Sequence, residues 1–371
     1  MGRSANFNGM VITGGGTVSN KAALVGNIAT GTILVTGTSS SWINSGSVQI
    51  GDGGVPGFTG TGILTVEDGG KVSNTNGFLG YYYTGVGIAT ISGSDTSGNA
   101  STWENSQQLQ VGRYGSGTLN ILNGGFVSNT GAYIGTYADG TGTGKGTVTV
   151  SGVDGNGHDS TWQISGDFIV GYQGNGTVEI KDGGKVSNTG DVALGYLYSN
   201  DTFVGSTGDV TVSGSGSTWA NSGELTVGNY GTGTLKVEDG GQVFNTNAYI
   251  GYAGDLGGTS SATISGSGST WKNTGDLYVG VFGSGTLVID KGGAVSNVDG
   301  IIGYANTGTV TVAGADAGGT VSTWTNSGNL FVGYDSGGAG TLTIENGGEV
   351  RASAASIATL PGSTGTLNLN G

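Results

Sequence analysis

A repeat marked by tryptophan is the feature that most constrains how this chain folds. Six Trp residues divide the sequence at intervals of 52 to 61 residues, and five of them stand in the triplet Ser-Thr-Trp. A second marker, Gly-Gly-x-Val, alternates with them along the chain. Because a short repeat cannot bury its own apolar face, such tiling predicts elements that stack on their neighbours. The tryptophans are Trp42, Trp103, Trp162, Trp219, Trp271 and Trp324.

Each interval is itself double, since its two halves share one pattern. Residues 234–254 and 261–283 both contain an alternating apolar strand, a Gly-rich corner, a short Val-x-Asn or Trp-x-Asn strand and an apolar strand ending in Gly. Three period-2 strands in roughly 28 residues predict an all-β, right-handed parallel β-helix of about 13 turns. A β-propeller or β-sandwich is the alternative, but the regular Asn-Gly hairpin turns of antiparallel strands are missing. We expect a single domain over residues 7–371, after an N-terminal tail at 1–6 that lacks the apolar stretch of a signal peptide.

Composition restricts the chemistry open to the chain. Of its 371 residues 83 are Gly, none is Cys and one is His, and the formal net charge is −14. The lack of Cys excludes disulfides and thiolate zinc sites, and a single imidazole excludes a cluster of His ligands. The acidic balance argues against nucleic acid, which needs a basic surface. We therefore expect no cofactor, no metal and no nucleic-acid partner, and no apolar run is long enough to span a bilayer.

Stacking turns each repeat position into a column. The second strand alternates Val with Trp, which predicts an interdigitating core, with a sugar-stacking platform as the alternative role for Trp. Two residues later Asn recurs on nearly every turn, with Ile164 and Ala352 as exceptions, and predicts a ladder of buried amides bonded up and down the column. Gly ends the third strand on every turn but one, where Ala358 replaces it, which predicts a positive φ or a tight corner.

Tyrosines near this Gly form the candidate binding site. A row of exposed Tyr is favoured at interfaces because the ring is large and amphipathic, whereas a column of rings that fastens the corner is the alternative. Three consecutive tyrosines at 81–83 cannot all point inward. The predicted surface stripe comprises Tyr81, Tyr82, Tyr83, Tyr172, Tyr196, Tyr252, Tyr304 and Tyr334.

The longer corners are the other places where function could be added. Residues 153–160, which include Asp154 and His158, faintly resemble a calcium loop but lack its closing bidentate Glu, so we interpret them as a solvated corner. A polysaccharide-cleaving β-helix needs clustered carboxylates in one groove, whereas the acids here recur in Asp-Gly-Gly turns. We therefore predict no catalytic residues and no enzyme activity. The longer corners are 93–100, 138–146, 152–160, 197–208 and 313–321.

The phrases GTLxIxxGGxVSN, xYIGY, GTVTVSGSGSTWxNSG and LxVGxxGxGTL resemble the repeat of bacterial autotransporter (type V secretion) passenger domains and some PEP-CTERM-associated surface proteins. The resemblance covers residues 7–371 and implies a β-helix displayed on, or secreted from, the extracellular side of a Gram-negative outer membrane. It implies adhesion or cell–cell association, including autoaggregation and biofilm formation. The expected partner is a host or bacterial surface glycan or protein, or a second copy of the chain. A translocator barrel, which would supply the membrane link, is not among these residues.

Two other functions stay open at this point. The chain is a passive stalk that presents a distal domain if its turns are uniform and carry no continuous exposed patch. It is a glycan-acting β-helix enzyme if two carboxylates meet in one groove.

Overall fold

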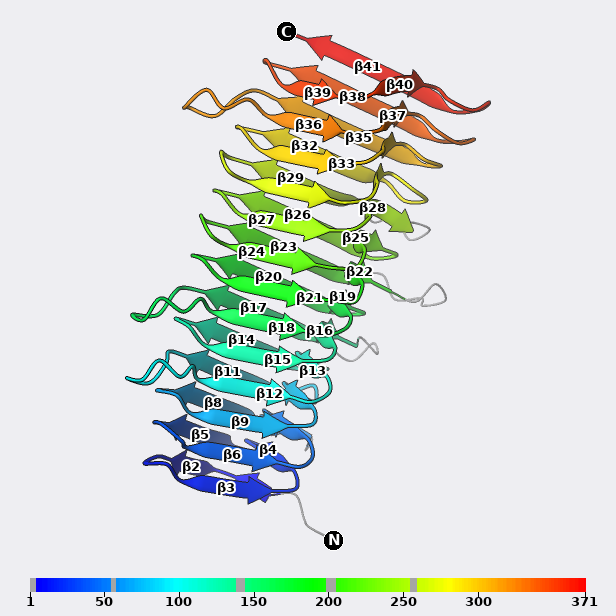
Figure 1. Ribbon diagram of the computed structural model, residues 1–371. Helices are drawn as coiled ribbons and strands as arrows, with labels where there is room; N and C mark the ends of the chain where they lie inside the picture. Colours follow the sequence, from blue (N-terminus) through cyan, green and yellow to red (C-terminus); the bar gives the residue numbers. More distant parts are fainter. Residues whose placement is uncertain (1–4, 55–57, 138–143, 198–204, 254–258) are drawn as a thin grey trace. The chain divides into compact units, whose positions relative to one another are not determined.

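The computed structural model describes residues 5–54, 58–137, 144–197, 205–253 and 259–371, and every regular element in these ranges is a β-strand (Figure 1). Three parallel sheets stack as a β-solenoid of about 12 turns with roughly 28 residues per turn. The predicted all-β parallel solenoid is therefore confirmed. The residues group into two compact units, Met1–Asn188 (unit 1) and Thr189–Gly371 (unit 2).

Among its described residues, unit 1 contains seven strands in each sheet. Its first strand, β1, begins at Ala5, inside the segment 1–6 that was expected to be a tail. The first sheet consists of β2 (Gly9–Ile12), β5 (Thr30–Thr36), β8 (Thr61–Glu67), β11 (Val86–Ser92), β14 (Ser116–Leu122), β17 (Lys145–Ser151) and β20 (Asn175–Lys181). The second consists of β3 (Thr17–Asn20), β6 (Ser41–Asn44), β9 (Lys71–Asn74), β12 (Thr102–Asn105), β15 (Phe126–Asn129), β18 (Thr161–Ile164) and β21 (Lys185–Asn188). The third consists of β1 (Ala5–Phe7), β4 (Ala23–Val25), β7 (Val48–Ile50), β10 (Gly77–Leu79), β13 (Leu109–Val111), β16 (Ala132–Thr136) and β19 (Phe168–Tyr172).

Unit 2 repeats the same order of strands. Its first sheet consists of β23 (Thr207–Ser213), β26 (Thr232–Glu238), β29 (Ser260–Ser265), β32 (Gly285–Asp290), β35 (Thr307–Ala313), β38 (Ala339–Glu345) and β41 (Thr364–Asn370). The second consists of β24 (Thr218–Asn221), β27 (Gln242–Asn245), β30 (Thr270–Asn273), β33 (Ala294–Asn297), β36 (Thr323–Asn326) and β39 (Glu349–Arg351). The third consists of β22 (Val192–Tyr196), β25 (Leu225–Asn229), β28 (Ala248–Ala253), β31 (Leu277–Val279), β34 (Gly300–Ile302), β37 (Asn329–Val332) and β40 (Ala354–Ile357).

The tryptophan column belongs to the core. All six Trp side chains are fully buried, so the prediction of core packing is confirmed and the sugar-platform alternative is wrong. Each large ring requires a small neighbour. A Cβ added at Gly77 would lie 2.8 Å from the ring of Trp103, and one at Gly300 would lie 2.7 Å from the ring of Trp324. Trp on one turn is thus matched by a small residue at the start of the third strand one turn earlier.

The asparagine column differs from the predicted continuous ladder. Asn245 Oδ1 accepts the indole N–H of Trp271 at 2.7 Å, and its Nδ2 donates to Asn273 Oδ1 at 2.7 Å. The amide of Asn273 then leaves the column and reaches the backbone carbonyl of Ser296 at 3.3 Å. The ladder is therefore divided into pairs, each bonded to one Trp, except at Asn129, which bonds Trp162 and faces Ile164 in place of an Asn. The reason is geometric, because the oxygen that the Asn273 amide would need on the following turn, Asn297 Oδ1, accepts the indole N–H of Trp324.

The two sequence markers are joined by a hydrogen bond that sequence reasoning did not foresee. The Ser of Ser-Thr-Trp is buried, and its hydroxyl accepts the backbone N–H of the first Gly of the preceding Gly-Gly-x-Val. Ser101 accepts from Gly69 at 3.1 Å, and Ser269 accepts from Gly240 at 3.0 Å. The corner between first and second strands is thus bonded from turn to turn.

The Gly that ends each third strand has positive φ, as predicted, and so does Ala358. At Gly280, with φ +78°, an added Cβ would lie 2.3 Å from the carbonyl oxygen of Thr307. Close backbone approach and left-handed geometry both select Gly here. This sharp corner fixes where the residues that follow it are placed, which include the tyrosines of the candidate site.

Candidate functional site

The outward side of the third sheet of unit 2 carries aromatic and aliphatic side chains where a solvated sheet usually carries polar ones. Parallel pairing places Tyr249 of β28 next to Tyr278 of β31, then Ile301 of β34, then Phe331 of β37. The rings of Tyr249 and Tyr278 stack with centroids 5.2 Å apart. We call the surface formed by these four residues the aromatic face.

Corner tyrosines border the aromatic face on one side. Tyr304 and Tyr334 follow the positive-φ glycines at the ends of β34 and β37, and their rings stack at 5.5 Å. Tyr252 contacts Tyr249 at 5.2 Å and is 39% exposed. Ring contacts therefore run between strands and corner, in the arrangement that the stacking alternative predicted, while the rings keep part of their surface in solvent.

Side-chain carboxylates and amides border the aromatic face on the other side, at the corner before each third strand. Asn247 Oδ1 accepts the backbone N–H of Asp276 at 3.0 Å, and Asp276 Oδ1 accepts that of Asp299 at 2.9 Å. Asp299 Oδ1 accepts the N–H of Asn329 at 2.6 Å. We call these four residues the Asx row. One side-chain oxygen of Asn247, Asp276 and Asp299 is thereby fixed by a backbone N–H, which holds these groups beside the rings.

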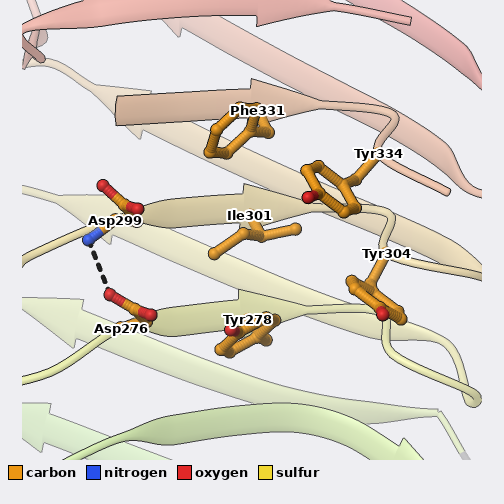
Figure 2. Close-up of a pocket in the computed structure, with 7 residues that line it drawn as sticks. All are labelled: Asp276, Tyr278, Asp299, Ile301, Tyr304, Phe331 and Tyr334. Atoms are coloured by element: carbon orange, nitrogen blue, oxygen red, sulfur yellow. Dashed lines mark hydrogen bonds between the residues drawn. The ribbon is translucent and has the colours of Figure 1, made fainter. Parts of the chain in front are cut away.

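A pocket of about 300 Å³ lies between the Asx row and the corner tyrosines (Figure 2). Figure 2 shows the two carboxylates on one side, the rings of Tyr304 and Tyr334 on the other, and the strand residues between them. Ile301 is 4% exposed and lies between its two aromatic neighbours, so it forms the floor. The lining residues are Asp276, Tyr278, Asp299, Ile301, Tyr304, Phe331 and Tyr334.

The electrostatic character of this surface is negative. Burial, reinforced by the carboxylate of Glu224, raises the pKa of Tyr249 to about 12. Burial and then the carboxylate of Asp276 raise the pKa of Tyr278 as well. The seven lining residues include two carboxylates and no cationic side chain. The pocket can therefore offer ring faces and negative charge to a ligand.

The tyrosines predicted in unit 1 form a different arrangement. Tyr81 packs edge-on against Phe78 at 5.0 Å and against Tyr82 at 4.7 Å, whereas Tyr82 and Tyr83 are 40% and 46% exposed. The guanidinium of Arg113 lies over the ring of Tyr81 at 4.4 Å and also approaches Phe78, Tyr114 and Tyr137. We call this group the Arg113 cage.

The structure thus distributes the eight predicted residues over both units. Tyr172 contacts Tyr133 at 5.7 Å in unit 1. Tyr196 ends β22 in unit 2 and makes a backbone bridge to Tyr230. Of the eight, the unit 2 pocket brings together Tyr304 and Tyr334. Sequence reasoning missed the strand-centre residues Tyr278 and Phe331; the signal available was an aromatic at the outward position of the third strand.

The longer corners at 93–100 and 152–160 are ordered hairpin-like loops that contact each other. Asp154 Oδ2 accepts from the Ser94 hydroxyl at 2.5 Å and lies 3.0 Å from the Nδ1 of His158. Loop N–H groups also bond Asp154 Oδ1, and the net effect of these bonds, against desolvation by burial, lowers the pKa of this carboxyl. The ranges that the structure describes contain no group of three or more His, Cys, Asp or Glu placed to hold a metal ion. The corners at 138–146 and 197–208 fall largely outside those ranges.

Fold and surface together define a repetitive β-solenoid with a solvent-facing aromatic pocket. Models of known protein families give no match to the chain. The chain is 39% identical over 112 residues, 30% of its length, to the adhesin BmaC autotransporter of Brucella suis biovar 1 (strain 1330). It is 29% identical over 268 residues, 65% of its length, to the uncharacterized lipoprotein YdeK of Escherichia coli (strain K12). It spans 3% and 17% of the lengths of these two proteins. The two partial matches support a loose autotransporter-like relation.

The described part of the chain contains no helix that is long and apolar enough to cross a membrane.

Proposed function

We propose that this chain is a surface-displayed passenger module that acts in adhesion or cell–cell association and has no enzyme activity. The observation that carries the proposal is the pocket on the aromatic face, because a sheet that only had to stay soluble would present polar residues there. Partial similarity to an autotransporter adhesin supports the same function and a location on the extracellular side of a Gram-negative outer membrane. The partner is a surface glycan or protein, or a second copy of the chain.

A binding assay with two site variants tests the proposal. Purified protein is applied to a glycan array, to host cells and to bacteria, and autoaggregation is followed by settling. We expect Tyr278→Ser with Tyr334→Ser to reduce binding if the unit 2 pocket is used, and serine at residues 81–83 to reduce it if the exposed tyrosines of unit 1 are used. Circular dichroism must show that each variant keeps its strand content.

Phe244→Ser provides a matched control. Phe244 points outward from the second sheet of unit 2, and its equivalent in the register of β33 is Ser296, so serine fits that position. This variant removes an aromatic ring without touching the aromatic face and should bind as the parent does. Binding that neither site variant changes would contradict an adhesive role for these surfaces and would favour the passive stalk.

A glycan-acting enzyme is the second candidate, because Asp276 and Asp299 place two carboxylates in one pocket. A glycosidase needs one carboxylic acid and one carboxylate across the scissile bond. However, Asn247 occupies the same type of position, and its Oδ1 accepts a backbone N–H as those of Asp276 and Asp299 do, which indicates that the backbone contact is the common role. Release of reducing sugar from a polysaccharide panel, lost in Asp276→Asn and Asp299→Asn, would favour the enzyme.

A further inference from the structure

The same short aromatic motif occurs in both units. Phe78-Leu79-Gly80-Tyr81 ends β10 in unit 1, and Phe331-Val332-Gly333-Tyr334 ends β37 in unit 2. The Phe and Tyr rings meet edge-on in both cases, with centroids 5.0 Å apart and interplanar angles of 84° and 79°. The two pairs are therefore equivalent surfaces, and what occupies one indicates what the other can hold.

In unit 1 the pair is occupied by a cation from the chain itself. Arg113 follows the third-strand Gly of the next turn, and its guanidinium carbon lies 4.4 Å from the ring centre of Tyr81 and 5.7 Å from that of Phe78. Its buried Nε has no hydrogen-bond partner, and Arg113 makes no ion pair among the described residues. Ring faces are therefore the main partners of this cation, a favourable arrangement because the ring quadrupole is negative above its plane.

In unit 2 the equivalent position is Thr359, which follows Ala358 on the next turn. No cationic side chain lines the pocket beside Phe331 and Tyr334. Instead, Asp276 and Asp299 bring negative charge to it. Each uses Oδ1 to accept a backbone N–H, and the structure gives Oδ2 of neither a partner among the described residues.

We propose that the unit 2 pocket binds the guanidinium of an arginine presented by a basic segment of a partner polypeptide. This inference rests on the proposed adhesive function and names the chemistry of its partner. The rings of Phe331 and Tyr334 take the place of Phe78 and Tyr81, and the two carboxylates of the pocket supply the charge that the Arg113 cage lacks. A net charge of −14 also attracts basic segments from a distance.

The test uses the full chain, with its Tyr and Phe rings labelled for NMR, and titrates it with each of two synthetic peptides. One peptide is acetyl-Gly-Ser-Arg-Ser-Gly-amide, and the other replaces Arg by citrulline, which keeps the shape and loses the charge. We expect the arginine peptide to shift the resonances of Tyr278, Tyr304, Phe331 and Tyr334. The citrulline peptide should bind at least about tenfold more weakly. Equal binding of the two peptides, or no shift with either, would overturn the proposal.

Removal of charge provides the second arm. Asp276→Asn with Asp299→Asn keeps the Oδ1 acceptor, and Asn247 shows that an amide accepts the same backbone bond. This variant should lower the affinity for the arginine peptide by about tenfold or more. Glu238→Gln with Asp239→Asn removes the same number of charges at a corner outside the pocket and should leave the affinity unchanged. Similar losses of peptide affinity in both variants would show that only the overall negative charge of the protein attracts the peptide, and would refute a specific site.

Occupation from within the chain provides the third arm. Thr359→Arg places an arginine at the position equivalent to Arg113 and should block the peptide, whereas Thr359→Gln should not. Unchanged affinity in Thr359→Arg would contradict the equivalence of the two motifs. Binding of a neutral oligosaccharide at these rings, without the arginine peptide, would overturn the guanidinium proposal.

The cell-binding assay separates this inference from the proposed function. Adhesion that survives Asp276→Asn with Asp299→Asn, while the peptide is lost, supports the cation pocket and places adhesion elsewhere. Adhesion lost in the tyrosine variants, while the arginine peptide never binds, overturns the pocket and leaves the adhesive function standing.

Discussion

Replacing Asn245 by Ala tests whether the Trp–Asn pairs hold the solenoid together. The Asn245 amide makes three hydrogen bonds: it accepts from Trp271 Nε1 at 2.7 Å and donates to Asn273 Oδ1 at 2.7 Å and to the Asn247 carbonyl at 2.9 Å. Asn245, Trp271 and Asn273 are all buried, so water does not readily replace the missing amide. Alanine leaves two buried side-chain groups, the indole N–H and an amide oxygen, without these partners.

The expected magnitude follows from those two groups. An unpaired buried donor or acceptor costs about 1–3 kcal/mol, so Asn245→Ala should lower the free energy of unfolding by about 2–6 kcal/mol. Asn129 provides a comparison within the same column. Its Oδ1 accepts from Trp162 at 2.7 Å, but its buried Nδ2 has no partner, because Ile164 occupies the position of the paired Asn. Asn129→Ala orphans one group only and should cost about 1–3 kcal/mol.

Urea unfolding followed by Trp fluorescence and by circular dichroism measures both variants. Because a stack of repeats can unfold in parts, the two probes must coincide before a single free energy is taken. Exchange of the indole N–H, observed by NMR, gives a local readout: it should accelerate at Trp271 in Asn245→Ala and at Trp162 in Asn129→Ala. Equal destabilisation by the two substitutions, or an unchanged midpoint in both, would refute the pairing argument.

Three further outcomes follow from the corners. Gly280→Ala places a Cβ 2.3 Å from a carbonyl oxygen and should abolish soluble expression, whereas Gly347→Ala, with positive φ and open space, should cost about 1–2 kcal/mol in urea unfolding. Ser269→Ala removes the acceptor of a glycine N–H and should cost about 1–3 kcal/mol by the same assay. Hydrogen bonds, first that from the Asn99 side chain, lower the pKa of Asp95 from 3.8 to about 2. The contribution of the Asp95 carboxylate to the stability of loop 93–101 is therefore present above pH 4 and is lost between about pH 4 and pH 2. Asp95→Asn should remove this pH dependence from the amide-exchange protection of the loop over that window.

The fold was predictable because each strand repeats one rule. Alternation within the first strand gives the inward set, as in β8, where Leu64 and Val66 are buried and Thr65 is not. Gly at the end of the third strand fixed the corner, and its positive φ followed from residue type alone. These features depend on local chemistry, which a single turn already contains.

The division of the Asn ladder was not predictable in this way. Asn245 bonds both the amide of Asn273 and the indole of Trp271, and whether the indole N–H reaches the Asn245 oxygen depends on how far the ring extends toward the turn before it, a distance set by packing. A column identified by residue type states which side chains are neighbours, but it does not assign the donors and acceptors. The ladder was therefore predicted as continuous where the indole N–H in fact takes one acceptor in each pair.

The pocket required information from three columns at once. The tyrosine column gave Tyr304 and Tyr334, the outward strand column gave Tyr278 and Phe331, and the corner column gave Asp276 and Asp299. Each column has a structural explanation when it is considered alone: ring stacking, a strand-forming aromatic, and an Asx side chain that accepts a backbone N–H. The pocket lies where neighbouring turns depart from the average in all three columns together. In a repeat protein, function is therefore to be sought where such departures coincide across turns, and unit 2 shows such a coincidence between β31 and β37.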